Sequence, residues 1–297
     1  MSLTGAKMED GRKETGERVR SALDDLEVRD SDYPRAVEMV KSSIFKISGP
    51  QGHGTGFLLS NGYILTNEHV THHNETHVAP DGEPFVPSLP LPITPPLLHG
   101  LRITPDANYV VQCFSDDDRV PGQEFRAAPV LLADGSRAIH KDMSLLRLPP
   151  NARLPGDMRP VTIGSARVGQ PTMIMGNPGG TDSHVGFGRV SRNVVMDAQG
   201  WGNPQWANVP FIVSDAPLNS GNSGGAAFAL RKERGPEGSE LKVELIGMPT
   251  YGVRGMHGLG GSIRADYIAW AATTKWGIPL MTPTQVVEYR RQFPTVE

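Results

Sequence analysis

SDAPLNSGNSGG, residues 214–225, is the stretch from which the rest of this sequence can be interpreted. It places Ser223 between Gly221 and the Gly224-Gly225 pair. Glycine adopts positive φ angles and allows close approach, so a serine in this setting presents its hydroxyl at a tight, accessible turn. We therefore predict that Ser223 is a nucleophile. A serine hydroxyl reacts weakly at neutral pH, so the prediction requires a general base and a group that orients the base.

The candidate base lies upstream, in GTGFLLSNGYILTNEHV, residues 54–70. Two β-type runs, Gly56–Leu59 and Tyr63–Thr66, flank an Asn61-Gly62 pair, which is a strong signal for a hairpin turn. His69 follows shortly after the second run. The sequence therefore predicts a β-hairpin whose end carries a histidine.

A candidate orienting acid lies in KDMSLLRL, residues 141–148. Asp142 precedes a leucine-rich run, so we expect it at the mouth of a buried strand. An ionised aspartate there can hold His69 in the tautomer that a general base needs. The chain thus supplies both groups that Ser223 requires.

The order of these residues along the chain decides between two kinds of hydrolase. The G-x-S-x-G pattern at 221–225 also fits the nucleophile elbow of α/β-hydrolases, whose acid and histidine follow the serine. After Ser223 the only histidine is His257, and the nearest plausible acid, Asp266, comes later still. The order His69, Asp142, Ser223 is instead the one found in chymotrypsin-like proteases.

At this point the sequence resembles trypsin-like serine proteases of the HtrA/Deg type. The resemblance covers about residues 36–268 and rests on these segments in matching order: AVEMVKSSIFKI, GTGFLLSNGYILTNEHV, VQCFSDDDRVPGQEFRAAPVLLADGSRAIHKDMSLLRL, VGQPTMIMGNPGG with VGFGRVS, SDAPLNSGNSGGAAF, VELIGMPTYG and GLGGSIRADYI. It implies an all-β fold of two six-stranded antiparallel β-barrels, with an N-terminal arm and C-terminal helices. It also implies serine endopeptidase activity by a His69, Asp142 and Ser223 triad.

The resemblance further implies where the substrate would lie. The oxyanion hole would be formed at Gly221, Asn222 and Ser223. The specificity pocket would be lined by the following residues: Ala216, Pro217, Leu218, Ile246, Met248 and Thr250. None of these side chains is charged, so we expect cleavage after small or medium aliphatic residues. Discrimination should be modest, since one methylene is worth only ~1–3 kcal/mol in an apolar pocket.

The domain organisation follows from length and from the resemblance. We expect a charged, partly helical arm at 1–35, a first barrel at 36–155 with a proline-rich insertion at 79–107, a second barrel at 156–264, and C-terminal helices at 265–297. In the second barrel, Phe228–Leu230 should pair with Lys242–Gly247 around a charged tip at Arg231–Glu240. About thirty residues follow the last strand, whereas a further domain needs at least ~50, so no PDZ domain is expected.

The stretch between Thr71 and Ala107 is rich in proline, which prevents regular backbone hydrogen bonding. We expect a long loop beside His69, either an ordered rim of the active site or a disordered flap, and its part from Pro80 to Pro96 should gate substrate entry. His72, His73 and His77 lie in it, but H-E-x-x-H is absent and a metal is not expected. No cofactor is expected either.

Composition bounds the partners and the compartment. The net charge is −3 with both signs interspersed, so nucleic acid is not an expected partner and polypeptide substrates are. Cys113 is the single cysteine, which excludes an intrachain disulfide. No apolar stretch is long enough for a membrane helix, and the first residues contain no signal-peptide core. The expected location is cytoplasmic, with periplasmic or secreted as the alternative if a leader was removed.

Two rival functions stay open at this level. One is a catalytically silent or chaperone-like binding protein on the same fold, since an intact triad can be held in a collapsed geometry. The other is an esterase that uses the same serine. An oligomer is possible, and nothing in the sequence establishes one.

Overall fold

The structure is a computed structural model of the 297-residue chain. It describes residues 26–49, 52–71, 102–103, 109–114, 122–150, 152, 154–156, 158–181, 184–197, 200, 203–252 and 259–295. The N-terminal arm before residue 26 and most of the proline-rich insertion, including His72, His73 and His77, lie outside the described residues. The predictions of a helical arm and of a gating loop concern those segments.

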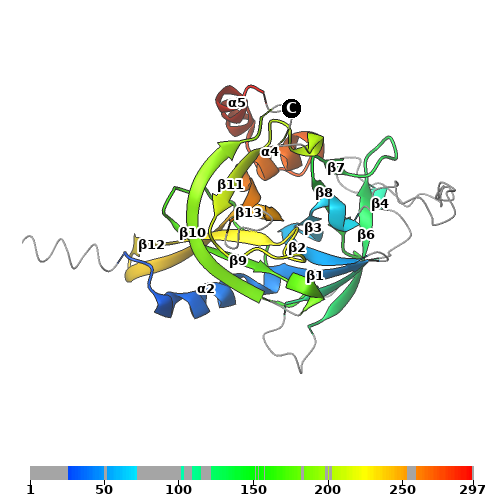
Figure 1. The fold of residues 1–297 in the computed structure, drawn as a ribbon. Helices are drawn as coiled ribbons and strands as arrows, with labels where there is room; N and C mark the ends of the chain where they lie inside the picture. The colour runs from blue at the N-terminus through cyan, green and yellow to red at the C-terminus, as the bar shows by residue number, and fades with distance from the viewer. Residues whose placement is uncertain are drawn as a thin grey trace, which may run out of the picture.

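The first half of the chain forms an antiparallel β-barrel, seen on the right in Figure 1. Its six-stranded ring runs in the order β1 (Ile44–Gly49), β2 (Gly52–Ser60), β3 (Tyr63–Thr66), β8 (Met143–Arg147), β6 (Glu124–Leu131) and β5 (Tyr109–Cys113). Pairing of β6 with β8 closes the ring, and the two-residue strands β4 (Arg102–Ile103) and β7 (Ile139–His140) extend it at its edges.

The second half forms a closed barrel of six antiparallel strands on the left of the same view (Figure 1). Its strands are β9 (Pro171–Gly176), β10 (His184–Val195), β11 (Pro210–Ser214), β12 (Ala226–Gly235), β13 (Gly238–Gly252) and β14 (Gly260–Arg264). The predicted fold of two six-stranded antiparallel β-barrels is therefore confirmed.

The apolar runs of the sequence fill two cores at once. In β2, Phe57 and Leu59 belong to a cluster that spans both barrels, whereas Leu58 between them packs inside the first barrel. Successive side chains of a strand point to opposite faces, so a strand buried on both faces must be apolar throughout. The hairpin that follows has Gly62 at φ 74°, and Phe57 pairs with Leu65, as the Asn61-Gly62 turn predicts.

The hairpin of β12 and β13 differs from the prediction. The charged stretch Arg231–Glu240 was expected as the tip of the hairpin, but both strands continue to a short turn between Gly235 and Gly238. Charged side chains stabilise this extension because Arg231 bonds Glu244 across the strands, with its Nη2 2.9 Å from a carboxylate oxygen. A cross-strand ion pair of this kind favours strand pairing beyond the end of the apolar run.

One part of the proline-rich stretch is also not a loop. Arg102 and Ile103 form β4, which pairs with Leu131 and Val130 of β6. No proline falls between Pro96 and Pro105, so the backbone amides needed for a ladder are present there. The expectation of a continuous loop is corrected at these two residues.

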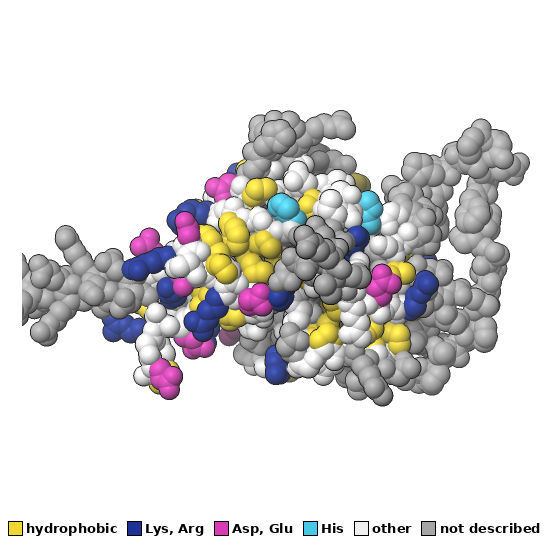
Figure 2. All heavy atoms as spheres, turned by 90° about the horizontal axis from the view of Figure 1, so that it is seen from below, with side chains coloured by type: hydrophobic (Ala, Val, Ile, Leu, Met, Phe, Trp, Pro, Cys, Tyr) yellow, Lys and Arg dark blue, Asp and Glu magenta, His cyan; other side chains and the backbone are white. Residues whose placement is uncertain are grey.

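Helices cover the outside of the barrels. They are α2 (Tyr33–Val40), α3 (Glu68–Thr71), α4 (Ala265–Lys275) and α5 (Pro283–Gln292). Thr282 and Gln285 form the predicted capping box at the start of α5. Figure 2 views the molecule from below Figure 1, where hydrophobic side chains gather among interspersed charges of both signs. Across the described residues, no helix combines the length and hydropathy that a membrane span requires.

Candidate active site

His69 lies on α3, the single helical turn that follows β3. Its imidazole Nδ1 is 3.0 Å from both carboxylate oxygens of Asp142, and its side chain is 48% exposed. The backbone N–H of His69 also donates to Asp142 Oδ1, at 3.3 Å. The Nδ1 edge of the ring is thus fixed by the carboxylate, while about half of the side chain is open to solvent or substrate.

Asp142 is held in a buried position between β7 and β8. Only 2% of its side chain is exposed. Its carbonyl accepts a hydrogen bond from Asn67 Nδ2 at 2.9 Å and another from the Glu68 backbone N–H at 3.2 Å. The preceding residue, Lys141, has φ 56°, a left-handed conformation that is costly for a side chain of this size. The chain therefore bends sharply to present Asp142 to His69.

A second contact supports this bend from the C-terminal side. Tyr267 on α4 lies 2.8 Å from His140 Nε2 through its hydroxyl oxygen. Burial, followed by the charges of Lys275 and Lys141, lowers the pKa of His140 to about 4, so the ring is neutral and can accept the Tyr267 proton. The strand β7, which ends two residues before Asp142, is thus bonded to a helix of the second half of the chain.

Ser223 lies in the loop that joins β11 to β12. Gly221 has φ 99° and Gly224 has φ 79°, values that a residue with a Cβ rarely adopts. A Cβ on Gly221 would lie 2.2 Å from the carbonyl oxygen of Asn177. The glycines that flank Ser223 in the sequence are therefore required both by backbone conformation and by close packing.

Hydrogen bonds orient this loop peptide by peptide. Three successive carbonyls each accept one bond: Ser220 O from Gly179 N at 2.6 Å, Gly221 O from Thr55 Oγ1 at 2.7 Å, and Asn222 O from Gly225 N of the same loop at 2.9 Å. Within the described part of the chain, the amide N–H groups of Gly221 and Ser223 have no acceptor. The carbonyl of each of these two peptides is held by a hydrogen bond, so the N–H groups of Gly221 and Ser223 have a fixed direction. An oxyanion hole requires donors that are oriented in this way.

Two glycines allow α3, which carries His69, to pack closely against the loop that carries Ser223. A Cβ on Gly54 would lie 2.6 Å from Val70, next to His69, and 3.3 Å from the carbonyl oxygen of Ser223. A Cβ on Gly224 would lie 2.8 Å from the amide of Asn67. Among the described residues, the Ser223 hydroxyl makes no hydrogen bond to His69. Catalytic hydrogen bonds often tighten only when substrate binds.

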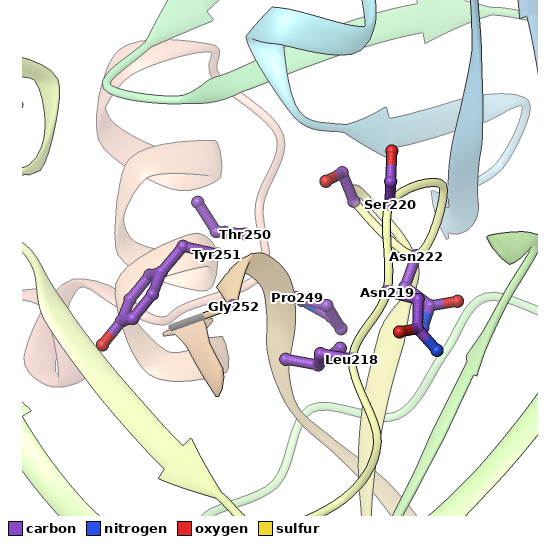
Figure 3. Close-up of a pocket in the computed structure, with 9 residues that line it drawn as sticks. Leu218, Asn219, Ser220, Asn222, Pro249, Thr250, Tyr251 and Gly252 are labelled. Carbon is purple, nitrogen blue, oxygen red and sulfur yellow. The ribbon is translucent and has the colours of Figure 1, made fainter. Parts of the chain in front are cut away.

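A pocket of about 300 Å³ opens beside Ser223. In Figure 3 the loop residues Leu218 to Asn222 face the strand residues Pro249 to Gly252 across it. It is lined by Leu218, Asn219, Ser220, Asn222, Ser223, Pro249, Thr250, Tyr251 and Gly252. No Asp, Glu, Lys, Arg or His is among these lining residues. Asp215 lies elsewhere, since its carboxylate accepts the backbone N–H of Arg189.

The lining of this pocket overlaps in part with the residues predicted for the specificity pocket. Leu218 and Thr250 line it as expected, but the other four predicted residues do not. Those four are Ala216, Pro217, Ile246 and Met248, of which Ala216, Ile246 and Met248 are buried in the cores. The register of β13 against β14 shifts between Pro249 and Tyr251. A bulge of this kind breaks the alternation of faces, so consecutive residues turn toward the pocket.

Sequence reasoning also missed residues around the pocket. The ring of Trp206 lies 5.1 Å from that of Tyr251, a pocket residue, so this aromatic supports the pocket wall. Gln205 donates to the carboxylate of Glu68 at 2.5 Å. Burial, followed by the negative charge of Asp142, raises the pKa of Glu68, and the bond from Gln205 opposes that rise. In the sequence, the aromatic residues between β10 and β11 were the one signal that could have indicated these contacts.

This geometry can be compared with known proteins. Residues 54–234, more than half of the chain, match the sequence model of the family described as "Trypsin-like peptidase domain". The chain belongs to the trypsin-like peptidase family. The resemblance to serine proteases of this type that the sequence predicts is confirmed at the level of family.

The curated relatives of this family member are proteins named "Probable periplasmic serine endoprotease DegP-like". One, from Pseudomonas fulva, is 28% identical over 187 residues, which is 62% of this chain and 28% of the relative. Another, from Pseudomonas fluorescens, is 30% identical over 184 residues, with the same coverage. The chain thus aligns with well under a third of the length of these relatives.

Solved structures show the same fold. The Rv3671c protease in its inactive form has a TM-score of 0.53 at 17% identity, over 84% of this chain and 97% of that one. The active form from M. tuberculosis has a TM-score of 0.50 at 18% identity, over 84% of this chain and 86% of that one. At this level of identity the likeness concerns the fold alone.

The comparison corrects one expectation from the sequence. A cytoplasmic location was expected from the absence of an apolar leader, and that expectation is wrong, because the matching relatives are named as periplasmic. An apolar run at the start of a sequence is not a reliable guide to compartment, because a leader is removed from a mature protein. The part of the chain that the structure describes contains no cluster of potential metal ligands.

Proposed function

We propose that this chain is a serine endopeptidase that hydrolyses peptide bonds with Ser223 as nucleophile, His69 as general base and Asp142 as the residue that orients the histidine. The observation that carries the proposal is the His69–Asp142 pair, 3.0 Å apart with the carboxylate buried, beside a pocket that ends at Ser223. Family membership and DegP-like relatives support it.

The reaction would proceed in two steps of acyl transfer. His69 takes the proton of Ser223 as the serine oxygen attacks the peptide carbonyl, and then gives that proton to the leaving amine. Asp142 stabilises the imidazolium formed in between. The developing oxyanion would be held by the backbone N–H groups of Gly221 and Ser223. Water then attacks the acyl-enzyme, with His69 again taking the proton and passing it to the departing serine oxygen, and the second product is released.

We also propose that the pocket beside Ser223 receives small or medium aliphatic side chains before the cut bond. Its side chains are uncharged at neutral pH, and burial raises the pKa of Tyr251 further above its ordinary value. A Lys, Arg or Glu side chain would enter without a partner for its charge, which is costly. Leu218 supplies the apolar wall. By the names of its relatives, the protein acts in the periplasm.

A fluorophosphonate probe tests the proposal directly. Labelling requires both a reactive serine and an assembled oxyanion hole, so we expect stoichiometric modification of Ser223. The Ser223→Ala variant, which keeps the fold, is the matched control. Failure of the wild-type protein to label would leave the silent binding protein as the better interpretation.

Two further measurements divide the remaining alternatives. Rates on matched amide and ester substrates distinguish a peptidase from an esterase. Mass spectrometry of a digested, denatured protein mixture reports the residue before each cut. A dominant Lys, Arg or Glu signal would overturn the aliphatic assignment while leaving the triad intact.

A further inference from the structure

Thr55 touches the serine loop through its backbone and its side chain, although it belongs to the other barrel. It lies on β2 and is completely buried. Its backbone N–H donates to the carbonyl of Ser223 at 3.0 Å, and its hydroxyl lies 2.7 Å from the carbonyl oxygen of Gly221. The proposed catalytic mechanism gives this hydroxyl no task.

The hydroxyl proton has one favoured acceptor. Thr55 Oγ1 lies 2.7 Å from Gly221 O and 3.2 Å from Asn177 Oδ1. Asn177 in turn donates its backbone N–H to Thr55 Oγ1, at 2.9 Å. A hydroxyl has one proton and two lone pairs, so the Thr55 hydroxyl can donate to Gly221 O and accept from Asn177 N at the same time. Thr55 therefore joins the serine loop to the turn that follows β9.

The carbonyl of Gly221 belongs to the peptide between the two amides of the proposed oxyanion hole. The peptide before it is fixed by the bond from Gly179 N to Ser220 O, and a trans peptide directs its N–H away from its carbonyl. The peptide after it is fixed by the bond from Gly225 N to Asn222 O. Of the three bonds that hold these successive peptides, the one to Gly221 O comes from a side chain, the Thr55 hydroxyl.

Gly221 is a point at which the backbone of the loop can change conformation. Glycine has no Cβ to restrict φ and ψ, so rotation about its bonds can turn either neighbouring peptide. A turned peptide would point a carbonyl instead of an N–H at the oxyanion. Such a loop needs an external bond on its central carbonyl to keep both donors in place.

We propose that Thr55 is a positioning residue: its hydroxyl, bonded to Gly221 O across the barrel interface, keeps the amides of Gly221 and Ser223 aimed at the oxyanion. The proposal rests on the function proposed above. It predicts that the hydroxyl contributes to the rate of acyl transfer without contacting the substrate.

Three variants test it. Thr55→Val keeps the shape and removes the hydroxyl, Thr55→Ser keeps the hydroxyl, and Thr172→Val is the matched control. Thr172 is 1% exposed on β9 and donates to Phe228 O at 2.8 Å, so its variant loses a comparably buried bond that does not touch the loop. Any general loss of stability should therefore be shared by both valine variants.

The first measurement is the rate of fluorophosphonate labelling, together with kcat and KM on a small peptide. For Thr55→Val we expect the labelling rate and kcat to fall by about 10²-fold, the size of effect produced by a small misplacement of catalytic groups, with KM nearly unchanged. Thr55→Ser and Thr172→Val should stay close to wild type. Equal rates in the two valine variants would overturn the proposal.

The second measurement does not depend on activity. Hydrogen exchange of the peptide that covers residues 219–224 should be faster in Thr55→Val than in Thr55→Ser or Thr172→Val. If the wild-type protein is not labelled, the proposed function fails, and the exchange comparison still decides whether Thr55 holds the loop. Unchanged exchange in Thr55→Val would refute the positioning role by itself.

Discussion

The His69–Asp142 pair and the Ser223 loop are held in place by different kinds of interaction. The pair depends on side chains, since the carboxylate of Asp142 contacts the ring and the amide of His69, and Asn67 supports Asp142. The loop depends mainly on backbone conformation, with Gly221 at φ 99°, and on one side-chain bond, from Thr55 to the Gly221 carbonyl. The pair should therefore be sensitive to changes of chemistry, and the loop to the addition of a single methyl group.

The largest expected effect concerns the pair. Asp142→Asn keeps the size of the side chain but turns an amide toward His69 Nδ1, so the ring adopts the wrong tautomer for a general base. We expect kcat to fall by roughly 10⁴-fold. Circular dichroism and thermal unfolding should show the fold retained. A variant with more than a tenth of wild-type kcat would mean that the buried contact at 3.0 Å is structural only.

The second prediction concerns the loop. Gly221→Ala places a Cβ 2.2 Å from Asn177 O at a φ that disfavours side chains, so the loop must move and the Gly221 amide with it. Loss of one oxyanion donor typically costs about 10²–10³-fold in kcat. Peptide hydrolysis by the purified variant measures the loss.

Gly135→Ala is the matched control for this loop variant. Gly135 has a similar φ of 87°, but a Cβ there would have nothing within 4 Å. It therefore reproduces the backbone strain without the clash. If both alanine variants lose activity equally, the contrast between pair and loop does not hold.

The sequence indicates the elements that carry the candidate catalytic residues better than it indicates the residues that line the pocket. The Asn61-Gly62 turn and the apolar run after Asp142 specify local structure directly, and the hairpin and β8 lie where they indicate. The pocket wall was assigned through the family resemblance, and the bulge near Pro249 turns consecutive residues of β13 toward the pocket. A bulge is set by pairing with β14, which local pattern does not encode.

The third prediction concerns the support behind the pair. His140 has a pKa of about 4 in the folded protein against 6.5 as an ordinary histidine. Between these values the unfolded chain binds a proton that the folded chain does not, so the free energy of unfolding falls as the pH falls from 6.5 toward 4. His140→Gln keeps an acceptor for Tyr267 and removes the titration.

Thermal unfolding as a function of pH measures this contribution. The Tm of His140→Gln should fall less steeply than that of wild type over this window. Above pH 6.5 both proteins carry a neutral side chain here, so their Tm values should run in parallel. Parallel curves across the whole range would show that the ring is free to protonate and that the contact with Tyr267 is weak.

The smallest expected effect concerns the bond that links the pair to the second barrel. Gln205 donates to Glu68 at 2.5 Å, and Glu68 is adjacent to His69. Gln205→Ala removes a donor that favours the ionised carboxylate, while burial and the charge of Asp142 continue to oppose ionisation. The pKa of Glu68, already above its ordinary value of 4.5, should therefore rise further. Carbon-detected NMR titration of that carboxyl in both proteins measures the shift.

Because His69 stays bonded to Asp142, kcat of Gln205→Ala should fall by less than about tenfold, as for one hydrogen bond of ~1 kcal/mol. A larger fall would show that the pair, like the loop, depends on contacts across the barrel interface, and the distinction between the two regions would need revision.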